Sequence, residues 1–161
     1  MSYEGELLYS CPDTMFDFSQ AYAVVVSGDG PNHWGHMLLK AGPTYFQVVM
    51  GGVAGIHATP RYMNEAGYAR YLKESGKKEI RRFKVVIPHP QQAQLKLEQL
   101  LSQPRWWLGA VHNCEGLVEE IIVAGGGPRI HKGLMMLPTL SRPYPPSQRR
   151  SAFETRHDFP F

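Results

Sequence analysis

Three closely spaced apolar runs near the start of the chain constrain its fold more than any other feature. Residues 21–27 are rich in β-branched and apolar side chains and end at Gly28, while residues 33–40 and 44–50 flank the short segment Ala41-Gly42-Pro43. Runs of this length, separated by glycine and proline, are typical of strands, and a short turn between two of them is typical of a hairpin. The pattern therefore predicts one strand followed by an antiparallel hairpin.

Helical and strand patterns alternate further along the chain. They predict a helix from Thr59-Pro60 to Ser75, a strand over residues 79–87, a helix over 91–103, and a helix that begins near Cys114 and stops at Gly125-Gly126-Gly127. Threonine before proline is typical of a helix start, and glycine is the commonest helix stop. The expected fold class is α+β, with an antiparallel sheet packed against helices.

Composition indicates a single globular domain. A chain of 161 residues with 43% hydrophobic residues is long enough for one well-buried core and too short for two ordinary domains. We assign residues 1–142 to this domain and residues 143–161, which are rich in proline and arginine, to a C-terminal tail. The net charge of +3 comes from scattered Lys and Arg, so no nucleic-acid partner is predicted.

The first residues favour synthesis into the cytoplasm. Residues 1–6 are acidic and lack the basic and long apolar regions of a secretory signal, although export by a route without a cleaved signal stays open. No run approaches the ~18 consecutive apolar residues that would span a bilayer, so no transmembrane segment is expected. The two cysteines, Cys11 and Cys114, do not make a disulfide scaffold, which favours a reduced compartment.

Cys114 is the strongest candidate nucleophile. Leu117, Val118, Ile121 and Ile122 follow it at helical spacing, so the cysteine lies in the first turn of a helix. Unpaired backbone N–H groups and the positive end of the helix dipole at this position favour a thiolate, and the same groups can bind an oxyanion. Cys11 is the alternative, but it precedes Pro12, and no amphipathic helix clearly begins there.

A cysteine nucleophile needs a base, and the hairpin supplies one. With a two-residue turn at Ala41-Gly42, Lys40 would pair with Pro43, Met37 with Phe46 and His36 with Gln47. Gln47 could then bond one ring nitrogen of His36 and leave the other for the thiol. His33 and His36 would point to opposite faces of their strand, so neither a metal site nor a cofactor is predicted.

These residues occur in an order that resembles a known superfamily. Gly35-His36 opens a strand hairpin with a later Gly42, a further strand follows, and Asn113-Cys114-Glu115 opens a helix. This order is similar to that of the permuted papain-like proteins of the NlpC superfamily, including the lecithin retinol acyltransferase-like branch, which shares the Asn-Cys-Glu triplet. In the papain order the cysteine helix comes first, whereas here it follows the histidine hairpin. The resemblance spans roughly residues 20–124.

The resemblance implies a permuted papain-like fold and a set of catalytic roles. It makes Cys114 the nucleophile, His36 the base and then the acid, and Gln47 the residue that orients the imidazole. Two rivals stay open. His33-Trp34 is similar to the His-Trp that opens this hairpin in the acyltransferase-like branch, and His57-Ala58 is similar to the His-Ala that often ends its second strand.

The expected function is that of a thiol peptidase or amidase. The resemblance implies hydrolysis of an amide bond in a peptide, such as a bacterial cell-wall (peptidoglycan) peptide, through an acyl-enzyme on Cys114. An acyl transferase or esterase that acts on lipid is the alternative, and the apolar Trp106-Trp107 segment before the cysteine helix would suit it. A third reading is an inactive relative that binds a peptide or a partner protein. The oligomeric state stays open.

Overall fold

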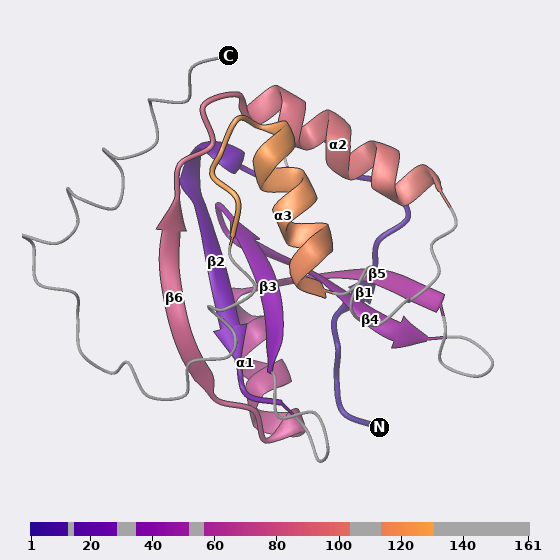
Figure 1. The fold of residues 1–161 in the computed structure, drawn as a ribbon. Coiled ribbons are helices and arrows are strands. Elements are labelled where there is room, and N and C mark those ends of the chain that lie inside the picture. Colours follow the sequence, from indigo (N-terminus) through magenta and orange to yellow (C-terminus); the bar gives the residue numbers. More distant parts are fainter. Residues whose placement is uncertain (13–14, 29–34, 52–56, 104–113, 131–161) are drawn as a thin grey trace, which may run out of the picture.

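A computed structural model describes residues 1–12, 15–28, 35–51, 57–103 and 114–130 (Figure 1). The elements are, in chain order, β1 (Glu6–Leu7), the short 3-10 helix η1 (Phe18–Gln20), β2 (Ala21–Val26), β3 (His36–Ala41), β4 (Thr44–Gly51), β5 (His57–Asn64), α1 (Glu65–Ser75), β6 (Glu79–Val85), α2 (Pro90–Ser102) and α3 (Cys114–Ala124). The tail predicted for residues 143–161 and the Trp106-Trp107 segment lie outside the described residues.

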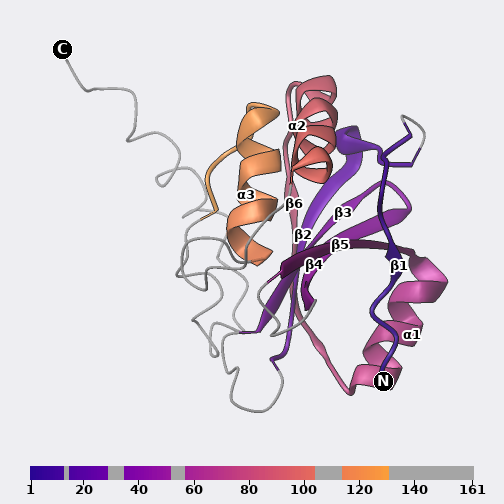
Figure 2. The same ribbon diagram turned by 90° about the vertical axis from the view of Figure 1, so that its right-hand side faces the viewer.

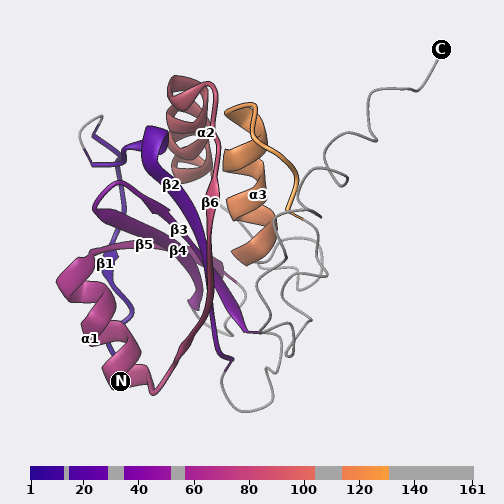
Figure 3. The same cartoon turned by 90° about the vertical axis from the view of Figure 1, so that its left-hand side faces the viewer.

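The strands form one antiparallel sheet with helices on both faces. The six strands lie in the order β1-β5-β4-β3-β2-β6, and every neighbouring pair is antiparallel. Helices α2 and α3 lie side by side on one face, and α1 lies on the other (Figures 2 and 3). The predicted α+β class and the antiparallel sheet packed against helices are confirmed.

Two separate cores hold these layers together. Met37 and Leu39 of β3 pack with Leu117 and Ile121 of α3 on one face of the sheet. On the opposite face, Leu38 belongs to a cluster that also contains the following residues of β2, β4, β5 and α1: Val24, Val26, Tyr45, Met63, Tyr68 and Tyr71. Both faces of β3 are therefore buried, one beneath α3 and the other beneath α1.

The hairpin between β3 and β4 differs in register from the prediction. The structure pairs Ala41 with Thr44 and Leu39 with Phe46, so the turn residues are Gly42 and Pro43, and the predicted pairing of His36 with Gln47 as direct partners is wrong. Pro43 has no N–H to give to a ladder, and a place in the turn avoids that loss. The shift is two residues, and because side chains alternate with a period of two, every residue keeps its predicted face.

The helix predicted to begin at Thr59-Pro60 begins later. Thr59 and Pro60 belong to β5, which pairs with β4 along its whole length, and the carbonyl of Pro60 accepts a hydrogen bond from the Leu8 N–H at 3.1 Å. The helix α1 starts at Glu65 because the Asn64 side chain caps it, with Oδ1 accepting from the Gly67 N–H at 2.8 Å. Its predicted end is confirmed, since Gly76 takes the left-handed conformation that terminates helices.

Candidate active site

The cysteine helix begins where the sequence predicts. Cys114 is the first residue of α3, and its side chain is only 6% exposed. The helix is fixed on the sheet by fully buried Ile121 and Ile122, and it ends at Gly125-Gly126-Gly127 as predicted. A β-carbon at Gly125 would collide with the Ile87 side chain and would lie only 3.1 Å from the β-carbon of Ala93 in α2. The nucleophile candidate is therefore held on a closely packed support.

The thiol of Cys114 is buried among backbone N–H groups. Burial raises the pKa of the thiol above its ordinary value, and the neighbouring Glu115 carboxylate acts in the same direction. The N–H groups of Met37, Glu115 and Cys114 itself oppose this by hydrogen bonding to the sulfur, but they do not reverse it. The N–H groups at the helix start thus favour the thiolate as predicted, but desolvation outweighs them and the pKa of the thiol is raised overall. A thiol in this state needs a base if it is to act as a nucleophile at neutral pH.

The structure joins His36 to Gln47 by a hydrogen bond. His36 Nε2 lies 2.8 Å from Gln47 Oε1, although the paired part of the hairpin ends at Leu39–Phe46. Gln47 is fully buried, and its Nε2 donates to the backbone carbonyl of Glu4 at 2.5 Å. A carbonyl can only accept, so this contact fixes the amide with its oxygen toward His36.

The orientation of Gln47 determines which ring nitrogen of His36 carries the proton. Because Oε1 is an acceptor, the neutral imidazole of His36 must be protonated on Nε2. Its Nδ1 then carries a lone pair and can take a proton from a neighbouring acid. This is the tautomer that a base for a thiol requires when the third group of a triad binds Nε2.

The Cys114 sulfur contacts the backbone next to His36, at the point where β3 separates from β4. The pairs between these strands run only from Leu39–Phe46 to Ala41–Thr44, while β4 stays paired with β5 as far as Gly51. In Figure 1 the two strands diverge beneath the start of α3. The N–H that bonds the Cys114 sulfur belongs to the peptide between His36 and Met37. The sulfur thus lies beside the peptide unit that carries His36.

The alternation of β3 determines the face of the sheet on which the His36 ring lies. Met37 packs with Cys114 in the core beneath α3, whereas Leu38 faces α1, and His36 shares the face of Leu38. Lys40, on the same face, bonds Glu65 of α1 at 2.8 Å. The His36 ring therefore lies on the α1 side, beyond the last pair of the β3–β4 ladder, and the Cys114 sulfur contacts the N–H of the following residue, Met37.

The rival residues fall into two groups. His33, together with His112 and Asn113, lies outside the described residues, and for His57 the structure gives the backbone alone, paired with Gly51 at the start of β5. Cys11 is a buried cysteine in the core beneath α2, where Gln94 Nε2 lies 3.0 Å from its sulfur and 2.9 Å from its carbonyl oxygen. Its surroundings are therefore those of a packed side chain.

Sequence reasoning missed two groups that complete the site. The carbonyl of Glu4 and the N–H of Met37 are both backbone atoms, which every residue except proline possesses. No residue-type signal could have identified them. Burial of Glu115, at 5% exposure beside the nucleophile, was also missed, because a glutamate in the first turn of a helix is ordinarily solvated.

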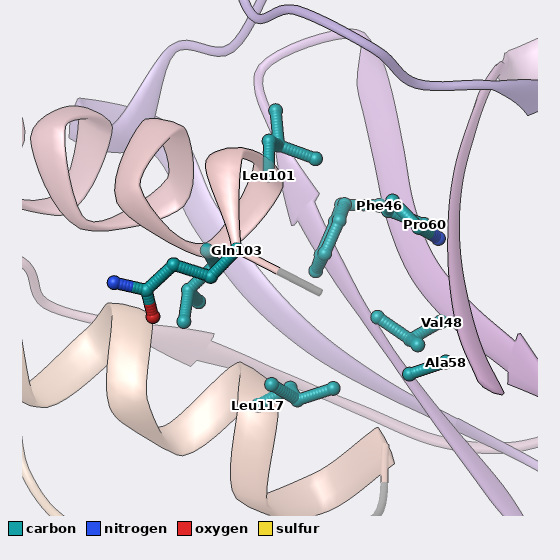
Figure 4. Close-up of a pocket in the computed structure, with 8 residues that line it drawn as sticks. Phe46, Val48, Ala58, Pro60, Leu101, Gln103 and Leu117 are labelled. Atoms are coloured by element: carbon teal, nitrogen blue, oxygen red, sulfur yellow. The ribbon is translucent and has the colours of Figure 1, made fainter. Parts of the chain in front are cut away.

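An apolar pocket lies one helical turn from Cys114 (Figure 4). Leu117 forms part of its wall, opposite side chains from β4, β5 and the end of α2. The remaining lining residues are Phe46, Val48, Ala58, Pro60, Leu100, Leu101 and Gln103. Gln103 is the one polar residue among them, so the pocket suits an apolar group.

Comparisons with protein-family models, with curated proteins and with solved structures found no match. Within the described ranges, no helix has the length and apolar character required to span a bilayer. The same residues contain no cluster of three or more His, Cys, Asp or Glu side chains arranged to hold a metal ion.

Proposed function

We propose that this protein is a cysteine hydrolase of permuted papain-like architecture that cleaves an amide bond in a peptide, such as a bacterial cell-wall peptide. The observation that carries the proposal is the chain of contacts from Glu4 through Gln47 to His36, beside a helix-start cysteine. Because both ends of the buried Gln47 amide are hydrogen-bonded, this amide can hold a base in one tautomer. The resemblance in residue order, histidine hairpin before cysteine helix, supports the same assignment.

The reaction follows from the roles of these groups. His36 Nδ1 takes the proton of Cys114 as the sulfur attacks the substrate carbonyl, and the N–H groups at the start of α3 stabilise the oxyanion. The C–N bond then breaks, and the imidazolium returns its proton to the leaving amine. Water attacks the resulting thioester, with His36 again accepting a proton, and releases the acid and the free thiol. Gln47 stabilises the imidazolium by keeping its oxygen on Nε2.

The test uses amide and lipid substrates in parallel. We expect synthetic cell-wall stem peptides to be cleaved, with a new amine and a new carboxylate detected by mass spectrometry, and phosphatidylcholine vesicles to be left intact. Lipid cleavage without peptide cleavage would move the assignment to the second candidate below. Neither activity, together with a Cys114 thiol that resists alkylation, would favour the non-enzymatic alternative of a peptide-binding protein.

The second candidate is a lipid esterase or acyl transferase, and the apolar pocket is the observation that favours it. Its wall includes Leu117, three residues after Cys114, so an acyl chain lodged there would have its carbonyl near the sulfur. In a transferase the thioester would pass its acyl group to an amine or alcohol rather than to water. The chemistry of the first step is shared with the amidase.

Filling the pocket should distinguish these candidates. In Ala58→Phe the ring would occupy space between β5 and Leu117, and kcat/KM for a long-chain acyl ester should fall at least about tenfold, since each buried methylene contributes about 0.8 kcal/mol. Turnover of the corresponding acetyl ester should change little. Ala66→Phe, at an exposed position of α1, is the matched control. Equal losses for short and long chains would show that the pocket does not hold the acyl group.

A further inference from the structure

The first residues of the chain are bound to the candidate catalytic residues. We define the N-terminal strap as residues 3–8. It is anchored to the second half of β5: β1 pairs Glu6 with Tyr62, Arg61 donates to the carbonyl of Gly5 at 2.7 Å, and the Leu8 N–H donates to the carbonyl of Pro60. At its other end, the Tyr3 N–H donates to Glu74 of α1 at 2.8 Å.

One carbonyl of this strap reaches the site. The Glu4 oxygen accepts from Gln47 Nε2, and the opposite end of the same amide bonds His36. Because an amide exposes an acceptor at one end and donors at the other, a rotation of 180° would turn Nε2 toward His36. The imidazole would then have to accept on Nε2 and carry its proton on Nδ1, where it could not take the proton of a thiol.

We propose that the N-terminal strap is a positioning element of the active site, in which the Glu4 carbonyl fixes the Gln47 amide and thereby keeps His36 in the tautomer that can deprotonate Cys114. The inference rests on the proposed function, because it explains what keeps His36 in the tautomer that the proposed reaction needs. It predicts that loosening the strap will change the tautomer of His36 without touching any residue of the triad.

Gly5 offers a way to move the strap by a single substitution. Its φ is +95°, and a β-carbon would lie 2.7 Å from the Tyr62 carbonyl oxygen, so Gly5→Ala must displace the strap from β5. Gly76 is the matched control, because it also has a positive φ, of +69°, and a β-carbon there would meet nothing within 4 Å. Gly76→Ala thus carries comparable backbone strain at the end of α1, without a collision against β5.

Two readouts report on the site rather than on stability. The ring nitrogens of His36 can be observed by long-range 15N–1H correlation, with the signals assigned by comparison with His36→Ala. The rate at which iodoacetamide alkylates Cys114 is followed at pH 7 by peptide mass mapping. We expect the Nε2–H tautomer in the wild type and in Gly76→Ala. Gly5→Ala should populate both tautomers and lower the alkylation rate by roughly tenfold, the factor that corresponds to the loss of one buried hydrogen bond.

One further variant makes the result decisive. Arg61→Met removes the donor to Gly5 without adding a β-carbon and should shift the tautomer in the same direction if Gly5→Ala does not fold. If His36→Ala slows alkylation but Gly5→Ala and Arg61→Met leave both the tautomer and the rate unchanged, the role of the strap is wrong. If His36→Ala itself has no effect, the proposed function is wrong.

Discussion

Cys114→Ala is expected to lower hydrolysis of the substrate by at least about 10³-fold, to the background rate, because the proposed reaction passes through an acyl-enzyme on this thiol. The fold should persist, since alanine fits a site that a small buried side chain already occupies and loses only one sulfur atom. The measurement is kcat on the peptide substrate, with circular dichroism to check that the variant is folded.

Cys11→Ala is the control for this prediction. Cys11 is equally buried, but it packs beneath α2 and contacts Gln94, so its loss should lower thermal stability slightly and leave kcat unchanged. The opposite pattern, an active Cys114→Ala variant beside an inactive Cys11→Ala variant, would transfer the role of nucleophile to Cys11.

His36→Ala is expected to slow alkylation of Cys114 at pH 7 on the order of 10²-fold, the lower range of what general bases contribute. Burial raises the pKa of this thiol above its ordinary value of 9.0. Without a base, the thiol therefore stays protonated at neutral pH, and its reactivity in the variant should keep increasing as the pH passes 9. The wild type should react readily well below that pH, because His36 takes the proton as the sulfur attacks.

His33→Ala tests the rival base in the same assay. Since His36 is the histidine bonded to Gln47, the His33 variant should retain the pH profile and the rate of the wild type. A His33→Ala variant that loses reactivity, with His36→Ala unaffected, would assign the base to His33 and leave the His36–Gln47 contact a structural one.

Local patterns were sufficient for the parts of the site that lie within single elements. The helix that begins at Cys114 and stops at the glycines after Ala124 follows from a 3.6-residue periodicity and a strong terminator. The prediction that His36 and Gln47 lie on the same face of the hairpin is correct although the predicted register is wrong, because a shift of two residues preserves the alternation of a strand.

The features that sequence patterns did not predict depend on contacts between segments that are distant in the chain. Thr59-Pro60 has the local character of a helix start, yet these residues form β5 because β4 pairs with them along its length. The two-residue strand β1 is too short to have a pattern, and the Glu4 carbonyl that orients Gln47 is an atom without a residue-type signature. The raised pKa of Cys114 depends on how deeply tertiary packing buries the thiol, which helix position alone does not specify.

The most direct test of the central claim is to identify the atom that carries the acyl group. Incubating the wild-type protein with an activated acyl ester, quenching in acid and mapping the peptides by mass spectrometry should locate a hydroxylamine-sensitive thioester on Cys114. This adduct should form much more slowly in His36→Ala and be absent in Cys114→Ala. An acyl group found on Cys11 or on a lysine, or an unmodified Cys114 in a folded protein, would contradict the assignment of Cys114, His36 and Gln47 as a catalytic unit.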